Sequence, residues 1–372
     1  MKGQATRDER FMARAIALAR RGQGRTRPNP VVGAVVVRAG KVVGQGFHGK
    51  AGGPHAEVVA LRQAGKLAQG ATLYVSLEPC GHFGKTPPCS RAIVEAGIKR
   101  VVFASTDPNP LVNRRGVRQL LRARISVSGG VLADAADRLN EPFFKVMRQG
   151  LPWVTLKVAS SLDGRVATHS GDSRWVSGPA SRAQVHALRE EVDAVVVGIN
   201  TVLKDDPQLT ARLPTSKRQP LRVVLDARLQ LPLRATVVRT ACDVPTWVMH
   251  GPHANALAAK HLVERGVRLL EVPLRAGKLD LRKAFAALAR EGQHHLLVES
   301  GGGLATALLS QGLCDDFWLV IAPKLVGRDG LSFWREKSPK LMREVQALTL
   351  VSCEQVGADL SLRLRPSQQE SA

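Results

Sequence analysis

The sequence predicts an α/β protein of two domains. Its 372 residues exceed the size at which a single hydrophobic core usually stops growing. Runs of β-branched residues alternate with amphipathic helical patterns along most of the chain, and this alternation favours layered α/β sheets. We place the domain boundary near residue 147, because residues 139–152 carry a proline at each end and a glycine, and a new strand pattern follows.

The first half begins with a helix, which we expect from Asp8 to Arg21. Its apolar residues recur at three- and four-residue spacing, and Asp8 can cap the first turn. Two β-branched runs, 31–37 and 41–46, then flank a short turn and predict a hairpin. After the hairpin the pattern alternates: we expect helices at 55–64, 88–96 and 116–123, and strands at 71–77, 100–104 and 125–128.

A second α/β series starts with a strand expected over 153–159. Further strands are predicted at 193–198, 221–226, 245–249, 267–272, 294–298 and 317–321, with helices at 179–191, 253–265, 279–290 and 303–311. The turn Gly301-Gly302-Gly303 lies between a strand and a helix, where free amides at the helix start can bind phosphate. A plain tight turn explains these glycines at least as well.

The chain is strongly basic: 54 Lys and Arg against 31 Asp and Glu give a formal charge of +23. Such a charge is compatible with nucleic acid, an acidic membrane or phosphorylated small molecules as partners. The excess consists mostly of arginines spread along the chain, and one Tyr, five Trp and nine Phe leave few aromatic rings for stacking on bases. We therefore expect a phosphorylated small-molecule substrate and no nucleic acid.

The sequence also bears on location and assembly. No apolar run reaches the roughly 18 to 20 residues that span a bilayer, and the charged start lacks the apolar core of a secretory signal. We expect no membrane association and a cytoplasmic location. Five cysteines, an odd number, argue against a disulfide framework, and we expect Cys242, Cys314 and Cys353 to be buried thiols. A homo-oligomer is compatible with the sequence.

Four residues in the first half form a metal-binding pattern: His55 and Glu57 in H-A-E, then Cys80 and Cys89 in E-P-C-G-H-F-G-K-T-P-P-C. A catalytic zinc keeps three protein ligands and one open position for a water. In zinc deaminases the neighbouring Glu is not a ligand but shuttles a proton from that water to the departing amine. The pattern indicates a hydrolytic deaminase, although eight residues separate the cysteines instead of the usual two.

The alternative for these residues is a closed structural zinc site, for which His82 is the available fourth ligand. That alternative leaves Glu57 without a role. The deaminase interpretation carries a geometric condition, because residues two apart lie on nearly opposite sides of a regular helix. His55 and Glu57 therefore converge only if the first turn of their helix is irregular.

The longer cysteine spacing belongs to a larger set of motifs. T-R-P-N-P-V-V-G-A-V-V-V (26–37), A-G-G-P-H-A-E (51–57), L-E-P-C-G-H-F-G-K-T-P-P-C (77–89) and D-P-N-P (107–110) resemble the bifunctional deaminase-reductase family of riboflavin biosynthesis. The resemblance continues through L-K-V-A-S-S-L-D-G-R (156–165), G-D-S-R-W-V-S (171–177), T-V-L-K-D-D-P-Q-L-T-A-R (201–212) and V-E-S-G-G-G-L-A (298–305). It implies a cytidine-deaminase-like three-layer α/β/α domain over 1–146, a dihydrofolate-reductase-like α/β domain over 150–367 and a disordered tail over 368–372.

The resemblance also implies two successive reactions. The first is zinc-dependent hydrolytic deamination of 2,5-diamino-6-(5-phosphoribosylamino)pyrimidin-4(3H)-one. The second is NADPH-dependent reduction of the ribosyl group to give 5-amino-6-(5-phosphoribitylamino)uracil. Zn²⁺ is then assigned to His55, Cys80 and Cys89, and catalytic proton transfer to Glu57.

Further site residues carry over by position. The implied cofactor contacts are Ala159, Trp175, Thr201, Asp205, Gly301, Gly302 and Gly303. The implied substrate contacts are Asn29, Ser173, Arg189, Leu209, Arg212 and Glu299, with Asp107 and Asn109 closing the pyrimidine pocket. Arg189 and Arg212 suit a phosphate because the guanidinium fork matches its geometry, although a surface ion pair explains either one equally well.

Two segments depart from the family pattern. Asn113-Arg114-Arg115-Gly116 stands where the family usually has a small, glycine-containing loop, and Ser300 stands where a glycine is common. Two alternatives to the bifunctional enzyme remain open. One is a single-activity deaminase with an impaired reductase half, and the other is a polynucleotide deaminase or nucleic-acid-binding protein, which only the basic charge favours.

Overall fold

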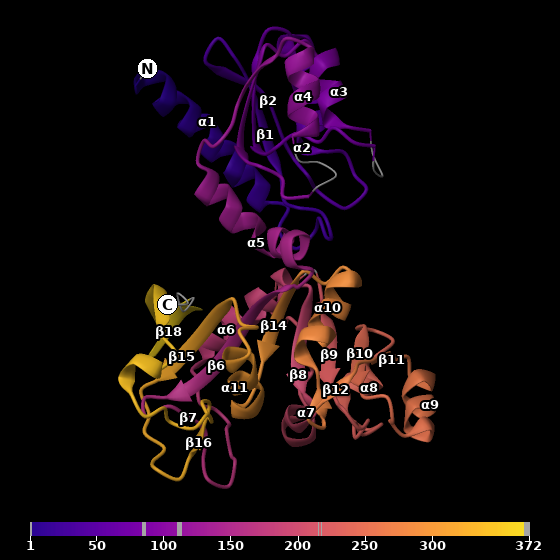
Figure 1. Cartoon of the computed structure of the whole chain (residues 1–372), viewed down its shortest axis with the longest axis vertical. Helices are drawn as coiled ribbons and strands as arrows, with labels where there is room; N and C mark the ends of the chain where they lie inside the picture. The colour runs from indigo at the N-terminus through magenta and orange to yellow at the C-terminus, as the bar shows by residue number, and fades with distance from the viewer. Residues whose placement is uncertain (1, 84–86, 110–113, 215, 217, 368–372) are drawn as a thin grey trace. The chain divides into compact units, whose positions relative to one another are not determined.

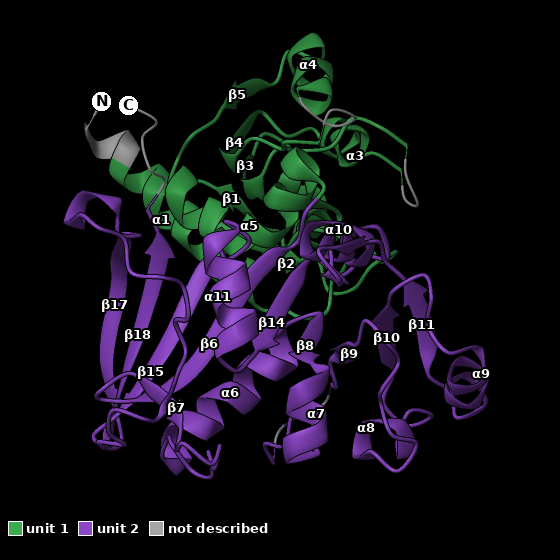
Figure 2. Cartoon of the chain, turned by 60° about the horizontal axis from the view of Figure 1, so that its bottom comes forward, with its two compact units in different colours: residues 1–150 green, residues 151–372 purple. Residues whose placement is uncertain are grey.

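The computed structural model describes residues 2–83, 87–109, 114–214, 216 and 218–367 (Figure 1). The predicted tail over 368–372 and Asn113 lie outside the described residues. The chain forms two compact units, Met1–Gly150 and Leu151–Ala372 (Figure 2). The boundary predicted near residue 147 lies inside the last helix of unit 1, α5 (Ala133–Gln149).

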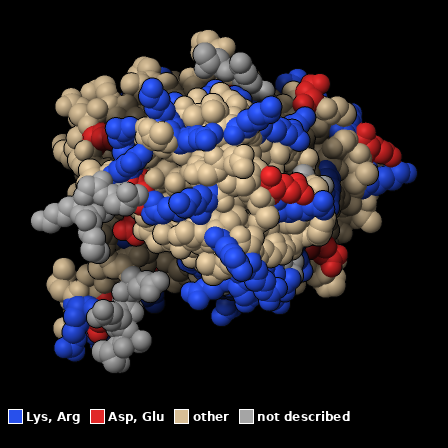
Figure 3. All heavy atoms as spheres, turned by 90° about the horizontal axis from the view of Figure 1, so that it is seen from above, with Lys and Arg blue, Asp and Glu red and all other residues tan. Residues whose placement is uncertain are grey.

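The basic residues of the face drawn in Figure 3 do not form one continuous patch. On the face drawn in Figure 3, Lys and Arg side chains lie in several separate groups among other residues, and Asp and Glu are fewer. Such an arrangement is typical of a solvated basic surface.

Among the described helices, none is both long enough and apolar enough to cross a membrane.

All five cysteines are free thiols. Burial was expected for three of them, because free cysteine usually packs as a small apolar residue. The expectation is correct for Cys314 and wrong for Cys242 and Cys353, which are exposed. Cys242 follows the short helix α8 (Thr236–Arg239), and Cys353 lies on the edge strand β17 (Leu348–Val356).

Unit 1 is a three-layer α/β/α sandwich, as predicted. Its other elements are α1 (Lys2–Arg20), β1 (Gly33–Arg38), β2 (Lys41–Phe47), α2 (Ala56–Ala64), the 3-10 helix η1 (Gly65–Ala68), β3 (Thr72–Leu77), α3 (Cys89–Glu95), β4 (Arg100–Ser105), α4 (Arg115–Arg122) and β5 (Ser126–Ser128). The sheet order is β2-β1-β3-β4-β5, antiparallel on both sides of β1 and parallel from β3 to β5. Because side chains alternate along a strand, Val35 packs on the side of α1 and α5, and Val36 packs on the side of α2, α3 and α4.

The sequence did not predict α5, which contains Pro142. A proline inside a helix removes one backbone hydrogen bond, and residues 139–152 therefore resembled a linker. Tertiary contacts compensate for the lost bond. The side chain of Asn140 accepts a hydrogen bond from the Val31 amide (2.9 Å) and donates one to the Val31 carbonyl (3.0 Å), and Ala136 is fully buried against the sheet. α5 thus anchors the segment between α1 and β1.

Unit 2 is built on a nine-stranded sheet. Its other elements are β6 (Trp153–Ser161), β7 (Arg165–Ala167), α6 (Pro179–Glu191), β8 (Ala194–Gly198), α7 (Ile199–Asp205), β9 (Leu221–Leu225), β10 (Thr246–His250), α9 (Ala256–Glu264), β11 (Arg268–Glu271), β12 (Leu274–Arg275), β13 (Lys278–Leu279), α10 (Leu281–Arg290), β14 (His295–Glu299), α11 (Gly302–Ser310), β15 (Asp316–Ala322), β16 (Leu331–Ser332), η2 (Met342–Glu344) and β18 (Asp359–Pro366). The sheet order is β11-β10-β9-β8-β14-β6-β15-β18-β17. The strands from β11 to β15 are parallel, and β18 and β17 are antiparallel additions.

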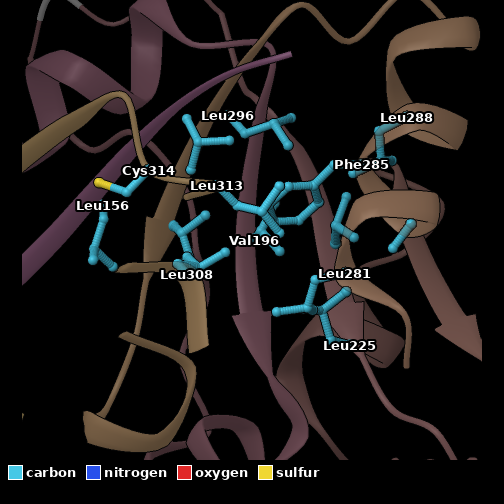
Figure 4. Close-up of a cluster of buried hydrophobic side chains, with 14 of the residues drawn as sticks. Leu156, Val196, Leu225, Leu281, Phe285, Leu288, Leu296, Leu308, Leu313 and Cys314 are labelled. Carbon is cyan, nitrogen blue, oxygen red and sulfur yellow. The ribbon is translucent and has the colours of Figure 1, made fainter. Parts of the chain in front are cut away.

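Two apolar cores hold the helices of unit 2 against this sheet. Figure 4 shows part of one of them, in which Phe285 of α10 and Leu308 of α11 pack against Val196 of β8. The neighbouring residue Val197 faces the other core, beneath α6, α7, α8 and α9. Helices therefore cover both faces of the sheet, as the alternating pattern predicted.

The hairpin of β17 and β18 was not predicted, although the sequence carries a signal for it. Residues 359–365 (D-L-S-L-R-L-R) alternate apolar and polar side chains, which is typical of a half-buried strand. Gly357 has a φ of 63° and closes the turn. α7 and α8 were also missed, because helices of seven and four residues are too short to show a helical period.

The sheet topology leaves a crevice at the carboxyl end of β14. This strand inserts between β6 and β8, which are consecutive long strands in the sequence. The chain leaves β14 into α11 on one face of the sheet and leaves β8 into α7 on the other. In open α/β sheets, ligands bind outside the carboxyl ends of the strands at such a switch point.

Arg222 is a fully buried cation in β9. Its guanidinium donates hydrogen bonds to the carbonyls of Val244 (2.6 Å), Thr240 (2.9 Å) and Val237 (3.1 Å), and to the Thr240 hydroxyl (2.8 Å). A longer bond reaches the Gln208 carbonyl (3.3 Å). Burial lowers the pKa of Arg222 to about 10, which still leaves it charged at neutral pH. This side chain ties the segment around α8 to the loop that follows α7.

We expect Arg222→Met to lower the free energy of unfolding by about 3 kcal/mol, because several buried carbonyls lose their donor together. Urea denaturation of the full chain at neutral pH measures this change. Arg290→Met, at an exposed position of α10, is the control and should change stability by less than about 0.5 kcal/mol. Equal stability of the two variants would show that the hydrogen bonds of Arg222 contribute nothing measurable.

Candidate functional site

The first site lies where α2 and α3 begin. His55 is the residue before α2 and has extended backbone angles (φ −66°, ψ 155°), whereas Glu57 lies in the first helical turn. The irregular helix start required for His55 and Glu57 to converge is therefore present. Cys89 is the first residue of α3, and Cys80 lies in the loop after β3.

Three of these side chains form a compact donor cluster. The Cys80 and Cys89 sulfurs are 3.3 Å apart, and the Cys80 sulfur is 3.5 Å from His55 Nδ1. The three donor atoms all lie within 4.8 Å of one another. The sulfurs are too far apart for a disulfide and close enough to share one metal ion. His82 is not a member of the cluster, so the part of the chain that the structure describes supplies three donors, which fits a catalytic zinc better than a closed structural one.

The surroundings of the cluster favour thiolate at Cys80. The hydrogen bond from the Cys89 thiol, with further contributions from His55 and the Cys89 amide (3.3 Å), lowers the pKa of Cys80 to about 4. The Cys80 amide in turn donates to the Cys89 sulfur (3.1 Å). The hydrogen bond with Cys80 raises the pKa of His55 to about 9. Thiolate and imidazole are the donor types that zinc prefers.

Glu57 is a buried carboxyl group next to the cluster. Only 3% of the residue is exposed, and its side chain forms a hydrogen bond with Cys89. Burial raises the pKa of Glu57 above the ordinary value for a glutamate. A carboxyl group with a raised pKa binds a proton more readily than an exposed glutamate does, and this property suits a general acid-base catalyst.

Asn29 lies close to the cluster through His48. The Asn29 side-chain nitrogen is 3.1 Å from His48 Nε2, and His48 Nδ1 is 3.1 Å from the Pro54 carbonyl. Burial lowers the pKa of His48, so the ring is neutral and donates from Nδ1 to Pro54 while Nε2 accepts from Asn29. This arrangement leaves the Asn29 amide oxygen without a donor among the described residues. The residue pattern favoured a polar loop residue or a substrate contact at His48 over a metal ligand, and its contact with Asn29 was not predicted.

Two glycines fix the loop that carries Cys80. A Cβ on Gly116 would lie 1.8 Å from the Pro79 carbonyl oxygen, and a Cβ on Gly81 would lie 2.5 Å from the Gly116 amide nitrogen. Backbone therefore contacts backbone at this point. The segment 113–116 departs from the family pattern, and Gly116 is its one glycine. The start of α4 depends on this glycine.

Asp107 lies beside the same loop. Burial raises its pKa to about 6, and the pKa is also affected by the charges of Cys80 and His82. Its carboxylate accepts a hydrogen bond from the Asn109 amide (2.8 Å). Asp107 is therefore close to the cluster. Asn109 contacts Asp107, through its backbone amide, and not the cluster itself.

The second site is a cavity of about 1030 Å³ at the crevice of unit 2. The predicted residues that line it are Ala159, Ser173, Trp175, Arg189, Thr201, Asp205, Arg212, Glu299, Gly301, Gly302 and Gly303. Leu209 is the exception: its side chain is 2% exposed and packs in the core beneath α6–α9, and its φ is 56°. Six basic lining residues were not predicted, because nothing distinguishes them from the other basic residues in the sequence: Arg182, His186, Lys204, Arg275, Lys278 and Arg335.

The glycine turn offers a phosphate site. Gly301 caps α11, and Gly302 is its first residue. A Cβ on Gly302 would lie 2.2 Å from the Ser332 carbonyl oxygen, so only glycine allows this close approach. The buried Ser300 hydroxyl has no hydrogen-bond partner among the described residues. Free amides at a helix start and an unpaired hydroxyl in a cavity suit the phosphates of a dinucleotide.

Arg189 and Glu299 form a bidentate ion pair inside this cavity. Arg189 Nε and Nη2 donate to the two Glu299 oxygens at 2.6 and 2.8 Å, and Nη1 donates to the Thr210 carbonyl at 2.9 Å. The Arg189 side chain is 9% exposed and the Glu299 side chain 18%. Burial by itself raises the pKa of Glu299, but Arg189 and the charge of Lys157 outweigh it and hold this pKa below the ordinary value.

Two family models match the chain. Residues 5–105 match the cytidine and deoxycytidylate deaminase zinc-binding region, and residues 152–362 match the RibD C-terminal domain. Together with the donor cluster and the cavity, these matches define the class of protein: a zinc-dependent deaminase joined to an NADPH-dependent reductase.

Named relatives match over nearly the whole chain. The riboflavin biosynthesis protein RibD of Aquifex aeolicus (strain VF5) is 47% identical over 325 residues, which cover 87% of this chain and 89% of the relative. RibD of Escherichia coli (strain K12) is 41% identical over 371 residues, with 96% and 99% covered. The chain belongs to the RibD family of riboflavin biosynthesis proteins. The predicted fold class, bifunctional activity and cofactors, Zn²⁺ and NADPH, are thereby confirmed.

Solved structures of the family agree with this fold. Acinetobacter baumannii RibD, form 1, has a TM-score of 0.89 at 42% identity and covers 98% of this chain and 100% of its own. The diaminohydroxyphosphoribosylaminopyrimidine deaminase/5-amino-6-(5-phosphoribosylamino)uracil reductase of Thermotoga maritima has a TM-score of 0.85 at 35% identity, with 98% and 100% covered.

We expect Arg189→Met to lower the free energy of unfolding by about 3 kcal/mol at pH 7, because it leaves the Glu299 carboxylate buried without its main partner. In the wild type the lowered pKa of Glu299 adds stability above about pH 4.3, and this stability is lost as the pH falls through the lowered pKa. In the variant, burial raises the pKa of Glu299, so this carboxylate takes up a proton as the pH falls. The loss in free energy of unfolding relative to the wild type should therefore shrink between pH 7 and pH 4.5. Denaturant unfolding across this range measures it.

The control is Arg268→Met, which removes a more exposed pair with Glu291 at a similar distance, 2.7 Å. It should cost less than about 1 kcal/mol at every pH. A deficit in Arg189→Met that does not change with pH would contradict the coupling to Glu299.

Proposed function

We propose that unit 1 deaminates 2,5-diamino-6-(5-phosphoribosylamino)pyrimidin-4(3H)-one and that unit 2 then reduces the ribosyl group to give 5-amino-6-(5-phosphoribitylamino)uracil. The name of the Thermotoga maritima relative contains both activities, and its similarity to this chain extends over both units. The observation that carries the proposal is the convergence of His55, Cys80 and Cys89 beside the buried Glu57.

In unit 1 the side chains divide the work of deamination. His55, Cys80 and Cys89 would hold zinc, which when bound makes a water acidic enough to act as a nucleophile. Glu57 takes the proton of that water on its carboxylate and returns it to the departing amine. Its raised pKa supports this shuttle, because the group must be able to bind a proton for part of the cycle. Asn29, oriented by His48, accepts a hydrogen bond from the pyrimidine ring with its amide oxygen.

In unit 2 the chain supplies binding and orientation. NADPH carries the hydride when it is bound. Ala159 and Trp175 contact its nicotinamide end, the Gly301-Gly302-Gly303 amides bind its pyrophosphate, and Thr201 and Asp205 also contact the cofactor. Their common cavity supports these assignments.

The reductase substrate lies against the Arg189–Glu299 pair. Glu299, held by Arg189, accepts hydrogen bonds from the ribosyl hydroxyls, and Ser173 donates one from the rim of the cavity. Arg212 binds the substrate phosphate, because its guanidinium is exposed at the cavity and has no carboxylate partner among the described residues. Leu209 contributes through its backbone, because its side chain is in the core.

We further place the enzyme in the cytoplasm, with no nucleic acid as a partner. Free thiols, two of them exposed, support a reducing compartment. The scattered basic groups of Figure 3 and the few aromatic residues argue against a binding surface for single strands. The basic surface instead favours phosphorylated small molecules.

We also infer that the enzyme is a homo-oligomer that pairs through β17. This strand is the edge of the nine-stranded sheet, and most of its residues are exposed. Leu350 and Val351 are 57% and 56% exposed, and Met342, in the 3-10 helix that precedes this strand in the sequence, is 82% exposed. An exposed apolar edge strand is a template for pairing with another chain.

Replacing Glu57 with Gln tests the deaminase assignment. We expect the variant to retain zinc and to release ammonia at least about 10²-fold more slowly, because it loses its proton shuttle. It should not oxidise NADPH when given the diaminopyrimidinone, but it should oxidise NADPH when given 5-amino-6-(5-phosphoribosylamino)uracil. Metal analysis, ammonia release and NADPH absorbance are measured on the same preparation.

The matched variant is Cys80→Ser, which should lose zinc as well as ammonia release and should keep reduction of the uracil. Full zinc occupancy in Cys80→Ser would contradict its role as a ligand. Wild-type ammonia release by Glu57→Gln would contradict the proton shuttle, and NADPH oxidation with the diaminopyrimidinone as substrate would contradict the order of the two reactions.

Replacing Val351 with Glu tests the assembly. We expect it to lower the molar mass measured by light scattering from that of an oligomer to that of a single chain, because a charge at a buried apolar contact is costly. Val263→Glu in α9 is the control, since Val263 has the same exposed fraction, 56%. A single-chain mass for the wild type would show that β17 does not pair.

A further inference from the structure

The cavity of unit 2 continues beyond the glycine turn toward the outer strands of the sheet. It is lined after β8 by Thr201 and after β9 by Ala227, and a second hollow of about 540 Å³ adjoins it there, since Ala227 lines both. The sheet order from β6 through β14 and β8 to β9 spans three strand spacings, roughly 14 Å.

This order gives the bound cofactor a direction. With its nicotinamide at Ala159 on β6 and its pyrophosphate at the glycine turn after β14, a dinucleotide extends its adenosine past β8 toward β9. The assignment rests on the proposed cofactor site of unit 2. What remains to be identified is the group that recognises the phosphate on the adenosine ribose.

The hairpin of β12 and β13 places two cations at this end of the cavity. Arg275 and Lys278 are paired directly across the hairpin, so their side chains point to the same side of it. Ala276 and Gly277 form the tip, with φ of 50° and 74°. All four residues line the cavity.

Neither cation is neutralised by a carboxylate in the described part of the protein. Both are exposed, and neither has a carboxylate partner among the described residues. Asp280 also lines the cavity, but its carboxylate caps α10 by accepting a hydrogen bond from the Lys283 amide (3.1 Å). Like charges directly opposite each other destabilise a hairpin, and a dianion bound between them would relieve this repulsion.

We propose that Arg275 and Lys278 bind the 2′-phosphate of NADPH and so set the preference of the reductase for NADPH over NADH. A guanidinium and an ammonium facing one phosphate supply both a fork of donors and a second positive charge. Arg228, which lines the adjoining hollow and is exposed, adds to the positive field but is not required for the contact.

The test measures binding rather than turnover. Dissociation constants for NADPH, NADH, adenosine 2′,5′-bisphosphate and AMP are determined by calorimetry for the full chain and for the double variant Arg275→Gln/Lys278→Gln. We expect the variant to bind NADPH and the bisphosphate at least about tenfold more weakly. Its affinities for NADH and AMP, which lack the 2′-phosphate, should stay within about twofold of the wild-type values.

The control is Arg282→Gln/Lys283→Gln, which removes the same charge from exposed positions at the start of α10 that do not line the cavity. Equal weakening of NADPH binding in the control would mean a general field effect and would overturn the proposal. Equal weakening of NADPH and NADH in the test variant would also overturn it, because the hairpin would then act through its structure. A wild type that binds neither dinucleotide would refute the cofactor site itself, whereas one that binds both equally would refute only the role of this hairpin.

Discussion

The deaminase half depends on where two helices begin. His55 can converge with Glu57 because the backbone is extended at His55 and becomes helical only at Ala56. Cys89 is the first residue of α3, where amides still lack helical partners, and the hydrogen bonds exchanged between Cys80 and Cys89 bring both sulfurs to one point. Had either helix begun one turn earlier, the same residues would point in different directions. The backbone contact of Gly81 with Gly116 then holds the residue that follows Cys80 against the start of α4.

The reductase half depends on strand order instead. Insertion of β14 between β6 and β8 places Glu299, at the end of β14, next to residues contributed by β6 and by the segment after β8. The Arg189–Glu299 pair illustrates the result, since its partners are far apart in the sequence but meet in one cavity. Such a pair stabilises the crevice and leaves a negatively charged group inside a basic cavity.

Local patterns predicted much of the fold and little of the geometry. Period-two and helical patterns located most strands of the two large sheets and most of the helices packed on them, because each buries one face in a core. They failed for α5, where contacts of Asn140 outweigh the effect of Pro142. They also failed for the β17–β18 hairpin, although apolar and polar side chains alternate along β18. In the site, motif spacing indicated His55, Glu57, Cys80 and Cys89. It could not show that His48 orients Asn29 or that the Leu209 side chain is in the core, because both depend on contacts between segments distant in sequence.

The hydrogen bonds between Asn140 and Val31 have a consequence for how the two activities could be separated in evolution. They make the helix that precedes the reductase half an integral part of the deaminase core. A gene that encoded the deaminase alone would have to keep the coding region through the end of α5. An earlier stop codon that removed Asn140 would leave the Val31 amide and carbonyl buried without partners. A division after Gly150, where unit 1 ends and the last turn of this helix is complete, keeps these hydrogen bonds within the deaminase half.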